Sequence, residues 1–183
     1  MTTKKVLVTA DELRRMPDDG WRYELVKGKL VKMPPGGGEH GGSSHKAGLR
    51  LGHYAEPLGI GEVLGAETGF LLEHGPDTVR APDAAVISKD RLPGGRLPRG
   101  YIEGPPDLAV EVVAHDDHPS DVQKKVEEWL AAGAQQVWVL YCQTHTVRRY
   151  EGGREPQLLR EDEILTGEPL LPGFACRVRD LFA

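Results

Sequence analysis

The chain has 183 residues, of which 39% are hydrophobic and 28% are charged. This length suits one domain of ordinary size, and we expect residues 1–183 to fold as one. The formal net charge of −5 counts against a protein that coats nucleic acid through phosphate contacts alone, because such proteins are usually basic. It counts less against an enzyme in which bound metal ions meet the phosphates.

The expected location is the cytoplasm. The two cysteines, Cys142 and Cys176, form no CxxC pair, so the sequence predicts neither a zinc site nor a disulfide scaffold, and a reducing compartment is the default. No apolar run is long enough for a signal peptide or a membrane helix. We therefore expect no membrane partner.

The N-terminal half begins with a short helix and a hairpin. Residues 9–12, TADE, form a capping box that predicts a helix ending near Pro17. Two alternating runs within residues 22–33 flank Lys-Gly, which is a hairpin signal. Residues 34–42 are rich in proline and glycine and predict a loop. Apolar residues at helical spacing then predict a helix over residues 47–58.

The middle of the chain is predicted to form strands. Strand-like runs occupy residues 61–64, 69–73 and 81–88. Residues 89–106 are polar and predict a long loop. The next apolar run, DLAVEVV at residues 107–113, is nearly continuous, as is usual for a strand buried on both faces.

A helix follows that strand. Residues 120–123, SDVQ, resemble a second capping box, and Gly133 is expected to end the helix as a C-cap. Residues 136–141, QVWVLY, predict another buried strand, which completes a βαβ unit. Runs at residues 146–151 and 157–160 predict a closing meander, and residues 179–183 a last helical turn. The expected fold class is α/β, with a mixed central sheet flanked by helices.

Glu111 is the first candidate site residue. It stands in the middle of DLAVEVV, between Val110 and Val112. A carboxylate inside a buried strand is costly unless a cation pairs with it or a metal ion binds it. Two interpretations therefore remain open: Glu111 forms an ion pair with a buried Arg or Lys, or it is a metal ligand.

Asp83 is the natural partner of Glu111. It follows Pro82, which is tolerated at the start of a strand because its missing N–H costs little there. If the strands carrying Asp83 and Glu111 are neighbours, both carboxylates can point at one spot. Oxygen ligands of this kind suit Mg²⁺ or Mn²⁺. Ordinary turn chemistry is the alternative explanation of a Pro-Asp pair.

Lys125 is the third candidate. The apolar face of its helix centres between Val126 and Trp129, and Lys125 falls about 80° from that centre while Lys124 falls almost opposite. Lys125 can therefore lay its stem along the core and send its ammonium group toward the carboxylates. The alternative is an ordinary lysine on the flank of a helix.

The remaining candidates carry weaker signals. Glu24 lies in an alternating strand, where a surface role is equally compatible with the pattern. His40 follows the glycine-rich loop, and polar surface is the simplest interpretation of it. His115 and His118 make an H-x-x-H pair, but they stand in a loop ending at Pro119, where a zinc site is not expected. The chain contains neither a P-loop nor a G-x-S-x-G motif.

The ordered set of these motifs resembles a known family. The stretches are YELVKGKLVKMPPGGGEHG, GEVLGAETGFLL, RAPDAAVIS, GPPDLAVEVV, KVEEWLAAGAQQVWVL and LPGF. Their order and spacing resemble the Uma-two family of nucleases, over nearly the whole chain from about Glu12 to Phe182. That family is placed in the PD-(D/E)XK superfamily, which implies a restriction-endonuclease-like fold and a Mg²⁺-dependent phosphodiesterase site.

The resemblance assigns roles to residues that match its motifs. Asp83 matches the PD element, Glu111 the acidic residue of the (D/E)XK element, and Glu24 the acidic residue near the N-terminus. The lysine of the motif would stand at residue 113, which is Val113. In the family this lysine is thought to have moved to the following helix, and Lys125 matches that place.

The expected function is metal-assisted hydrolysis of phosphodiester bonds, in DNA by analogy with the superfamily. Asp83 and Glu111 would hold one or two Mg²⁺ or Mn²⁺ ions, with the Val112 carbonyl as a further ligand. Lys125 would stabilise charge on the phosphate or help to position the water, and Glu24 would shape a second metal position or hold a water. A homodimer is expected because two strands need two cuts. Two alternatives remain open, which are a non-catalytic binding module and a hydrolase of small phosphate esters.

Overall fold

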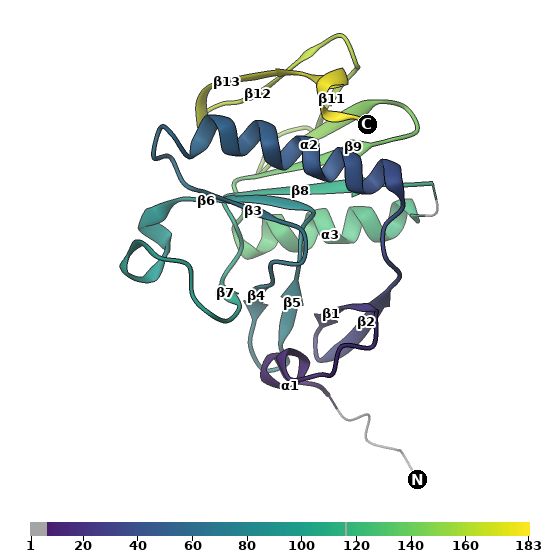
Figure 1. Ribbon diagram of the computed structural model, residues 1–183, viewed down its shortest axis with the longest axis vertical. Helices are drawn as coiled ribbons and strands as arrows, with labels where there is room; N and C mark the ends of the chain where they lie inside the picture. The colour runs from purple at the N-terminus through teal and green to yellow at the C-terminus, as the bar shows by residue number, and fades with distance from the viewer. Residues whose placement is uncertain (1–6, 116) are drawn as a thin grey trace.

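The computed structural model describes residues 7–115 and 117–183, and its centre is a six-stranded mixed sheet (Figure 1). Strands β8 and β9 run parallel, and the other neighbours in this sheet are antiparallel. In spatial order the strands are β11 (Gln157–Leu159), β10 (Thr146–Glu151), β9 (Gln136–Tyr141), β8 (Leu108–Val113), β6 (Ala84–Ile87) and β3 (Glu62–Gly65).

Two helices cover the two faces of this sheet, α2 (Gly38–Ala55) and α3 (Pro119–Ala132) (Figure 1). Strand β8 is buried on both sides because its residues alternate between two cores. Val110 and Val112 pack in the core that contains the α2 side chains, whereas Ala109 packs with Val126 and Trp129 of α3. Glu111 has the same parity as Ala109 and therefore faces α3.

The predicted βαβ unit is confirmed, since β8 and β9 are adjacent parallel strands joined by α3. The helix ends at Gly133, whose φ of 109° is a left-handed conformation that suits glycine. The predicted capping box at residues 120–123 is wrong. The helix begins at Pro119, two residues before the start that this box implies, and its N-cap residue His118 makes no side-chain capping bond. Proline is favoured in the first turn because the N–H that it lacks would be unpaired there.

A second, five-stranded sheet packs beside the first. Its core joins Leu25, Leu71 and Val79 to the helix α1, which begins with the predicted capping box of Thr9. The predicted hairpin is confirmed as β1 and β2 with the expected bounds. In spatial order the strands are β2 (Lys29–Met33), β1 (Arg22–Val26), β5 (Thr78–Arg80), β4 (Phe70–Glu73) and β7 (Ile102–Glu103), and α1 spans Ala10–Arg14.

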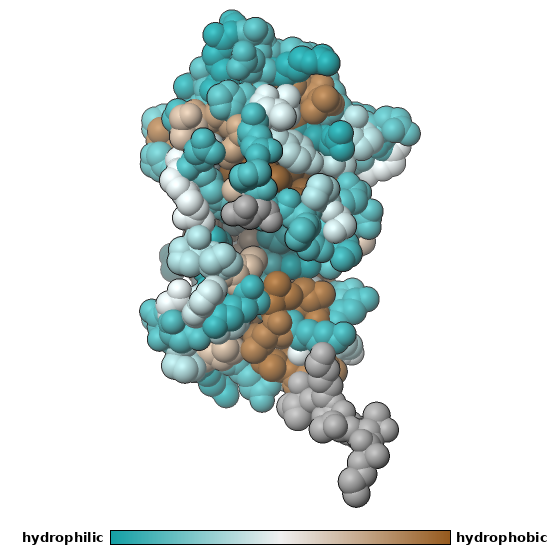
Figure 2. All heavy atoms as spheres, turned by 90° about the vertical axis from the view of Figure 1, so that its right-hand side faces the viewer, coloured by the Kyte–Doolittle hydropathy of each residue, from teal (hydrophilic) through white to brown (hydrophobic). Residues whose placement is uncertain are grey.

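The chain passes between the two sheets at residues 81–83, so the strand predicted for residues 81–88 is confirmed only over Ala84–Ile87, where β6 lies. Strand β5 ends at Arg80 in the five-stranded sheet, and β6 begins at Ala84 in the six-stranded sheet. Pro82 interrupts the backbone ladder because it has no N–H to donate. Asp83 therefore stands where the chain crosses from one sheet to the other. Figure 2 shows the surface narrowed between the two parts of the molecule.

Two further predictions need correction. The helix α2 begins at Gly38, inside the stretch predicted to be a loop through residue 42. The polar segment 89–106 contains β7 and two 3₁₀ turns in addition to loop. The sequence patterns also miss the hairpin of β12 (Ile164–Gly167) and β13 (Leu171–Arg177), which packs over the α2 side with the last 3₁₀ turn, Val178–Leu181. No described helix is long and apolar enough to cross a membrane.

Candidate active site

Asp83 and Glu111 lie on neighbouring strands, as the sequence predicts. The Asp83 backbone N–H donates to the Val110 carbonyl at 2.9 Å, and its Oδ2 accepts from the Val112 N–H at 2.8 Å. Burial alone would raise the pKa of Asp83, but the hydrogen bonds from His40 and from Val112 hold it below its usual value. The carboxylate is therefore fixed at the end of β6, directly beside β8.

Glu111 is clamped by two donors from α3. Lys125 Nζ lies 2.9 Å from Oε2, and the indole Nε1–H of Trp129 donates to Oε1 at 2.7 Å. The two donors are four residues apart, so they share one face of the helix. Burial is the largest influence on Glu111 and, despite the lysine, raises its pKa to about 7.

Glu24 belongs to the same cluster through a different set of bonds. Its carboxylate accepts from Arg80 Nη1 at 2.6 Å and from the Ala81 N–H at 3.1 Å, and Lys125 Nζ lies 3.2 Å away. Burial would raise the pKa of Glu24, but Lys125 and Arg80 outweigh it and lower that pKa. Arg80 also pairs with Glu128 of α3 at 2.6 Å.

Lys125 therefore lies between two carboxylates, Glu24 and Glu111. Burial acts to lower its pKa, but the two negative charges outweigh that effect and raise it, so the ammonium group stays charged. The neighbouring Lys124 is exposed and pairs with Asp121 at the surface, as the helix-face geometry predicts. One of the two interpretations of Glu111, an ion pair with a buried cation, is therefore observed, and the cation is Lys125. The carboxylate of Asp83 lies on the neighbouring strand as well.

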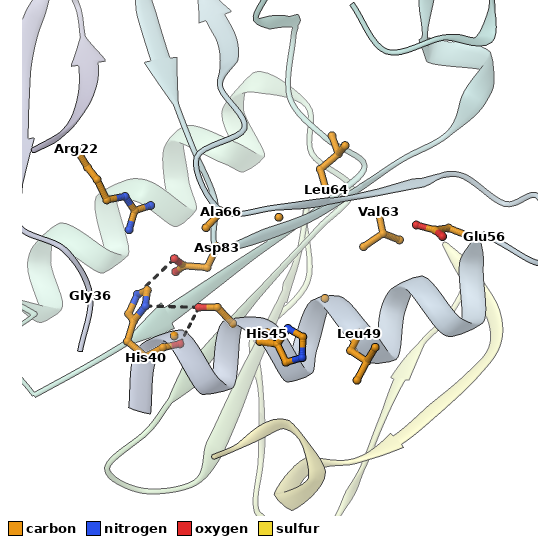
Figure 3. A pocket seen from close by; sticks show the side chains of 14 residues that line it. Arg22, Gly36, His40, His45, Leu49, Glu56, Val63, Leu64, Ala66 and Asp83 are labelled. Atoms are coloured by element: carbon orange, nitrogen blue, oxygen red, sulfur yellow. Dashed lines mark hydrogen bonds and ion pairs between the residues drawn. The ribbon is translucent and has the colours of Figure 1, made fainter. Parts of the chain in front are cut away.

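His40, which the sequence patterns leave as polar surface, contacts Asp83. Its Nε2 lies 3.3 Å from Asp83 Oδ1, and this contact raises the pKa of His40. Both residues line a cavity of about 500 Å³ between α2, β3 and the crossing segment. Arg22 lines the same cavity and points toward the pair in Figure 3. His40 and Asp83 are 43 residues apart in the sequence, so no local sequence pattern could have predicted their contact.

The cluster offers carboxylate oxygens that a divalent cation could bind. Three buried carboxylates, those of Glu24, Asp83 and Glu111, are paired with the cations of Arg80 and Lys125 and with the imidazole of His40. Asp83 is contacted by His40 and the Val112 N–H, and Glu111 by Lys125 and Trp129. Since a carboxylate has about four acceptor positions, each of the two keeps lone pairs that could bind a metal ion.

Two carboxylates are sufficient for one kind of metal site. No group of three or more His, Cys, Asp or Glu side chains within residues 7–115 and 117–183 is arranged to enclose a metal ion. Mg²⁺, however, usually keeps several waters and takes one or two carboxylates. The Val112 carbonyl points to the same edge of β8 as the Val112 N–H that bonds Asp83, since both groups of a strand residue face one side. Asp83, Glu111 and this carbonyl therefore fit a partly hydrated ion.

Comparison with known proteins identifies the family. The model of the Uma2 (Uma-two) family, described as "Putative restriction endonuclease", matches residues 10–179. The chain belongs to the Uma2 family. The predicted resemblance is therefore confirmed. No curated protein matches the chain.

A solved structure shares the fold of this Uma2 chain. It is described as a putative nuclease belonging to DUF820 from Anabaena variabilis, and it is 22% identical in sequence. The alignment covers 95% of this chain and 97% of that chain, with a TM-score of 0.80. The fold class predicted from the sequence is therefore confirmed.

Trp129 is a second residue whose part in the cluster the patterns miss, because the helix face assigns it to the core. The indole N–H offered a signal, since a buried tryptophan usually finds an acceptor. The H-x-x-H pair of this Uma2 chain is not part of the cluster. His115 Nδ1 lies 2.7 Å from Gln143 Nε2 near the surface, and His118 is the N-cap residue of α3.

Proposed function

We propose that the chain is a Mg²⁺- or Mn²⁺-dependent endonuclease that hydrolyses phosphodiester bonds in DNA. The observation that carries the proposal is the pair of buried carboxylates, Asp83 and Glu111, on adjacent strands with Lys125 bonded to one of them. The family description, "Putative restriction endonuclease", and the description of the solved relative as a putative nuclease support the same reaction class.

In this proposal Asp83, Glu111 and the Val112 carbonyl hold the metal. When bound, the ion would supply positive charge against the scissile phosphate and would acidify an attacking water. Asp83 lines the cavity, whereas Glu111 and Lys125 do not. Substrate would therefore enter along α2 and meet Asp83 first.

Lys125 supplies a fixed positive charge in the proposed mechanism. A preorganised cation in a site shielded from water stabilises negative charge that develops on the phosphate. Glu24 is a positioning residue here, because it holds the Lys125 ammonium at 3.2 Å and is itself held by Arg80. Its carboxylate accepts three donors, so a second metal position at Glu24 would have to displace one of them.

We further propose that the enzyme acts as a homodimer in the cytoplasm. A duplex has two strands, and two sites are needed to cut both. Cys142 and Cys176 are both buried and free, which suits a reducing compartment.

A non-catalytic binding module is the second candidate. The observation that favours it is the clamp on Glu111, in which Lys125 and Trp129 already satisfy both oxygens. A site that only recognises nucleic acid would keep this clamp and would not bind a metal.

The first test is a titration of Mn²⁺ into the purified protein by calorimetry, beside Asp83→Asn and Glu111→Gln. Asp121→Asn is the matched control, because Asp121 is an exposed aspartate on α3. We expect the wild type and the control to bind, and each site variant to lose at least about tenfold in affinity while remaining folded by circular dichroism. Cleavage of plasmid DNA, single-stranded DNA and RNA with Mg²⁺ or Mn²⁺ then defines the substrate.

The outcomes separate the two candidates. Binding that depends on both carboxylates, followed by DNA cleavage, supports the nuclease. A folded wild type that binds no Mn²⁺, or variants that bind it equally well, would overturn the nuclease and favour the binding module.

A further inference from the structure

Arg22 lines the cavity with Asp83 and His40, and Figure 3 shows its guanidinium directed toward that pair. It is the first residue of β1 and stands two residues before Glu24. Because side chains alternate along a strand, Arg22 and Glu24 share one face of β1 and are about 7 Å apart along it. The same strand therefore presents a carboxylate to the buried cluster and an arginine to the cavity.

The guanidinium of Arg22 is held loosely. Within residues 7–115 and 117–183 its one ion pair is a 3.5 Å contact of Nε with Oε1 of Glu67, whose side chain is 71% exposed. Within the same residues Nη1 and Nη2 make no hydrogen bond, and neither atom is buried, so both are open to solvent. An ion pair with an exposed partner contributes little, so Glu67 leaves Arg22 available to a ligand.

Arg80 provides the contrast, because its charge is used inside the protein. Its side chain is 9% exposed and pairs with Glu24 and with Glu128, at 2.6 Å in both cases. The side chain of Arg22 is 24% exposed and has no buried acidic partner in the part of the chain that the structure describes. One arginine therefore holds the buried cluster together, and the other keeps its positive charge for the cavity.

The free N–H groups of Arg22 define the class of ligand. A guanidinium presents parallel donors that match the oxygens of a phosphate or a carboxylate. In the proposed nuclease the scissile phosphate meets Asp83, and a nucleic-acid strand carries further phosphates on either side of it. The cavity of about 500 Å³ is of the size that encloses a small organic molecule. It therefore suits part of one strand, with one of its phosphates at Arg22.

We propose that Arg22 is a substrate-binding residue, and that its guanidinium binds a backbone phosphate of the nucleic-acid strand beside the phosphate that meets Asp83. This inference rests on the proposed function, which supplies nucleic acid as the ligand. A contact with the backbone carries no sequence information, so Arg22 strengthens the binding of every sequence alike. The contact needs no metal ion and can be measured without one.

The test measures the binding of a short fluorescein-labelled oligothymidylate by fluorescence anisotropy, with a chelator present and over a range of salt concentrations. The variants are Arg22→Gln, Arg22→Lys and Glu67→Gln. Arg15→Gln is the matched control, because Arg15 is exposed, pairs with Asp11 on its own helix and lies outside the cavity lining. Circular dichroism checks that each variant is folded.

Two readouts identify a phosphate contact. We expect Arg22→Gln to weaken binding by about tenfold or more. The slope of log affinity against log salt should become shallower by about 0.7, the value for one phosphate of a single strand. Arg22→Lys should keep the slope and bind less tightly than the wild type, because an ammonium group cannot form two parallel bonds. Arg15→Gln and Glu67→Gln should keep the wild-type affinity and slope.

An arginine that only supported the fold through Glu67 would give equal losses in Arg22→Gln and Glu67→Gln with an unchanged slope, and that result overturns the inference. A wild type that binds no oligothymidylate at low salt also overturns it. In NMR spectra of the wild type, the Nε–H resonance of Arg22 should shift when oligothymidylate is added. An unmoved resonance contradicts the contact whether or not the variants fold.

The outcomes distinguish this inference from the proposed function. Metal-dependent cleavage together with oligothymidylate binding that does not depend on Arg22 overturns the inference alone and leaves the nuclease standing. Binding that depends on Arg22 in a protein that takes up no Mn²⁺ supports the phosphate contact, overturns the nuclease and favours the binding module.

Discussion

The candidate site has two halves that differ in how their charges are held. The closed half consists of Glu24, Glu111, Lys125 and Trp129, together with Arg80. The open half consists of Asp83 and His40, with Arg22 beside them on the cavity wall.

Contacts within the closed half are short and mutual, at 2.6–3.2 Å for its four side-chain pairs. The open half meets the cavity, and its imidazole contacts are longer, at 3.3 Å and 3.5 Å. Buried charges must be paired within the protein because water cannot solvate them, whereas charges on a cavity wall stay available to a ligand. We infer that the closed half fixes the geometry and the open half receives the substrate.

The largest expected effect is on the closed half. Lys125→Met leaves Glu24 and Glu111 buried without their shared cation, so we expect the free energy of unfolding in urea to fall by about 3–5 kcal/mol. Lys124→Met, at the exposed neighbour, should change it by less than about 1 kcal/mol. Equal effects of the two substitutions would contradict the pairing of Lys125.

The raised pKa of Glu111 predicts a pH dependence of stability. Between the ordinary pKa of 4.5 and the native pKa of about 7, the folded state holds a proton that the unfolded chain has released. The free energy of unfolding contributed by Glu111 therefore falls as the pH rises through this window, by about 1–3 kcal/mol in total, and is constant above it.

Glu111→Gln removes this contribution. Asp83 and Glu24 have lowered pKa values and lose their stabilisation as the pH falls, so only the difference between wild type and variant isolates Glu111. We expect that difference, measured by urea unfolding with a chelator present, to slope between about pH 4.5 and 7. A flat difference would mean that Glu111 titrates normally.

Trp129→Phe probes the second donor to Glu111, and Trp138→Phe is its match, because Trp138 donates to the neutral Gln136. Trp129→Phe should lower the free energy of unfolding by about 1.5–3 kcal/mol and Trp138→Phe by about 0.5–1.5 kcal/mol, because hydrogen bonds to charged groups are stronger than those to neutral ones. Loss of the Trp129 donor should also raise the pKa of Glu111, which the pH profile detects. A purely structural tryptophan would leave that profile unmoved.

The smallest effect is expected in the open half. Gly36→Ala places a methyl group against His40, whereas Gly37→Ala meets open space. We expect both variants to stay within about 1 kcal/mol of the wild-type stability, as most substitutions outside the core do. Gly36→Ala alone should shift the imidazole resonances of His40 in NMR spectra. If Gly37→Ala shifts them equally, the packing of Gly36 is not what orients the ring.

In the closed half, local signals in the sequence could predict Glu111 and Lys125, whereas Arg80 and Trp129 were missed and Glu24 was assigned only by the family resemblance. A carboxylate inside an apolar strand marks Glu111, and the helix periodicity places Lys125 on the flank that faces it, at an observed 2.9 Å. The hairpin β1–β2 and the strand β9 have the predicted bounds. Alternation and helical spacing carry this information over a few residues, without knowledge of the rest of the fold.

In the open half, Asp83 could be predicted as the partner of Glu111, but the contact of His40 with Asp83 could not. His40 meets Asp83 only because α2 begins at Gly38 and crosses the end of β6, and the glycine-rich sequence of that start is typical of a loop. Strand β5 was missed because its three residues, Thr78–Arg80, are too few and too polar to form an apolar run, and only the tertiary fold places β5 and β6 in different sheets. Contacts between distant segments depend on packing that propensities do not encode.

The order of these residues along the chain has a consequence for biosynthesis. Glu24, His40, Asp83 and Glu111 leave the ribosome before Lys125, the cation that joins two of the three buried carboxylates. Domains generally fold as units during synthesis, so a nascent chain that ends before α3 leaves Glu111 without Lys125 and Trp129 and cannot complete the cluster. In the proposed enzyme, activity would therefore have to wait until α3 has been synthesised.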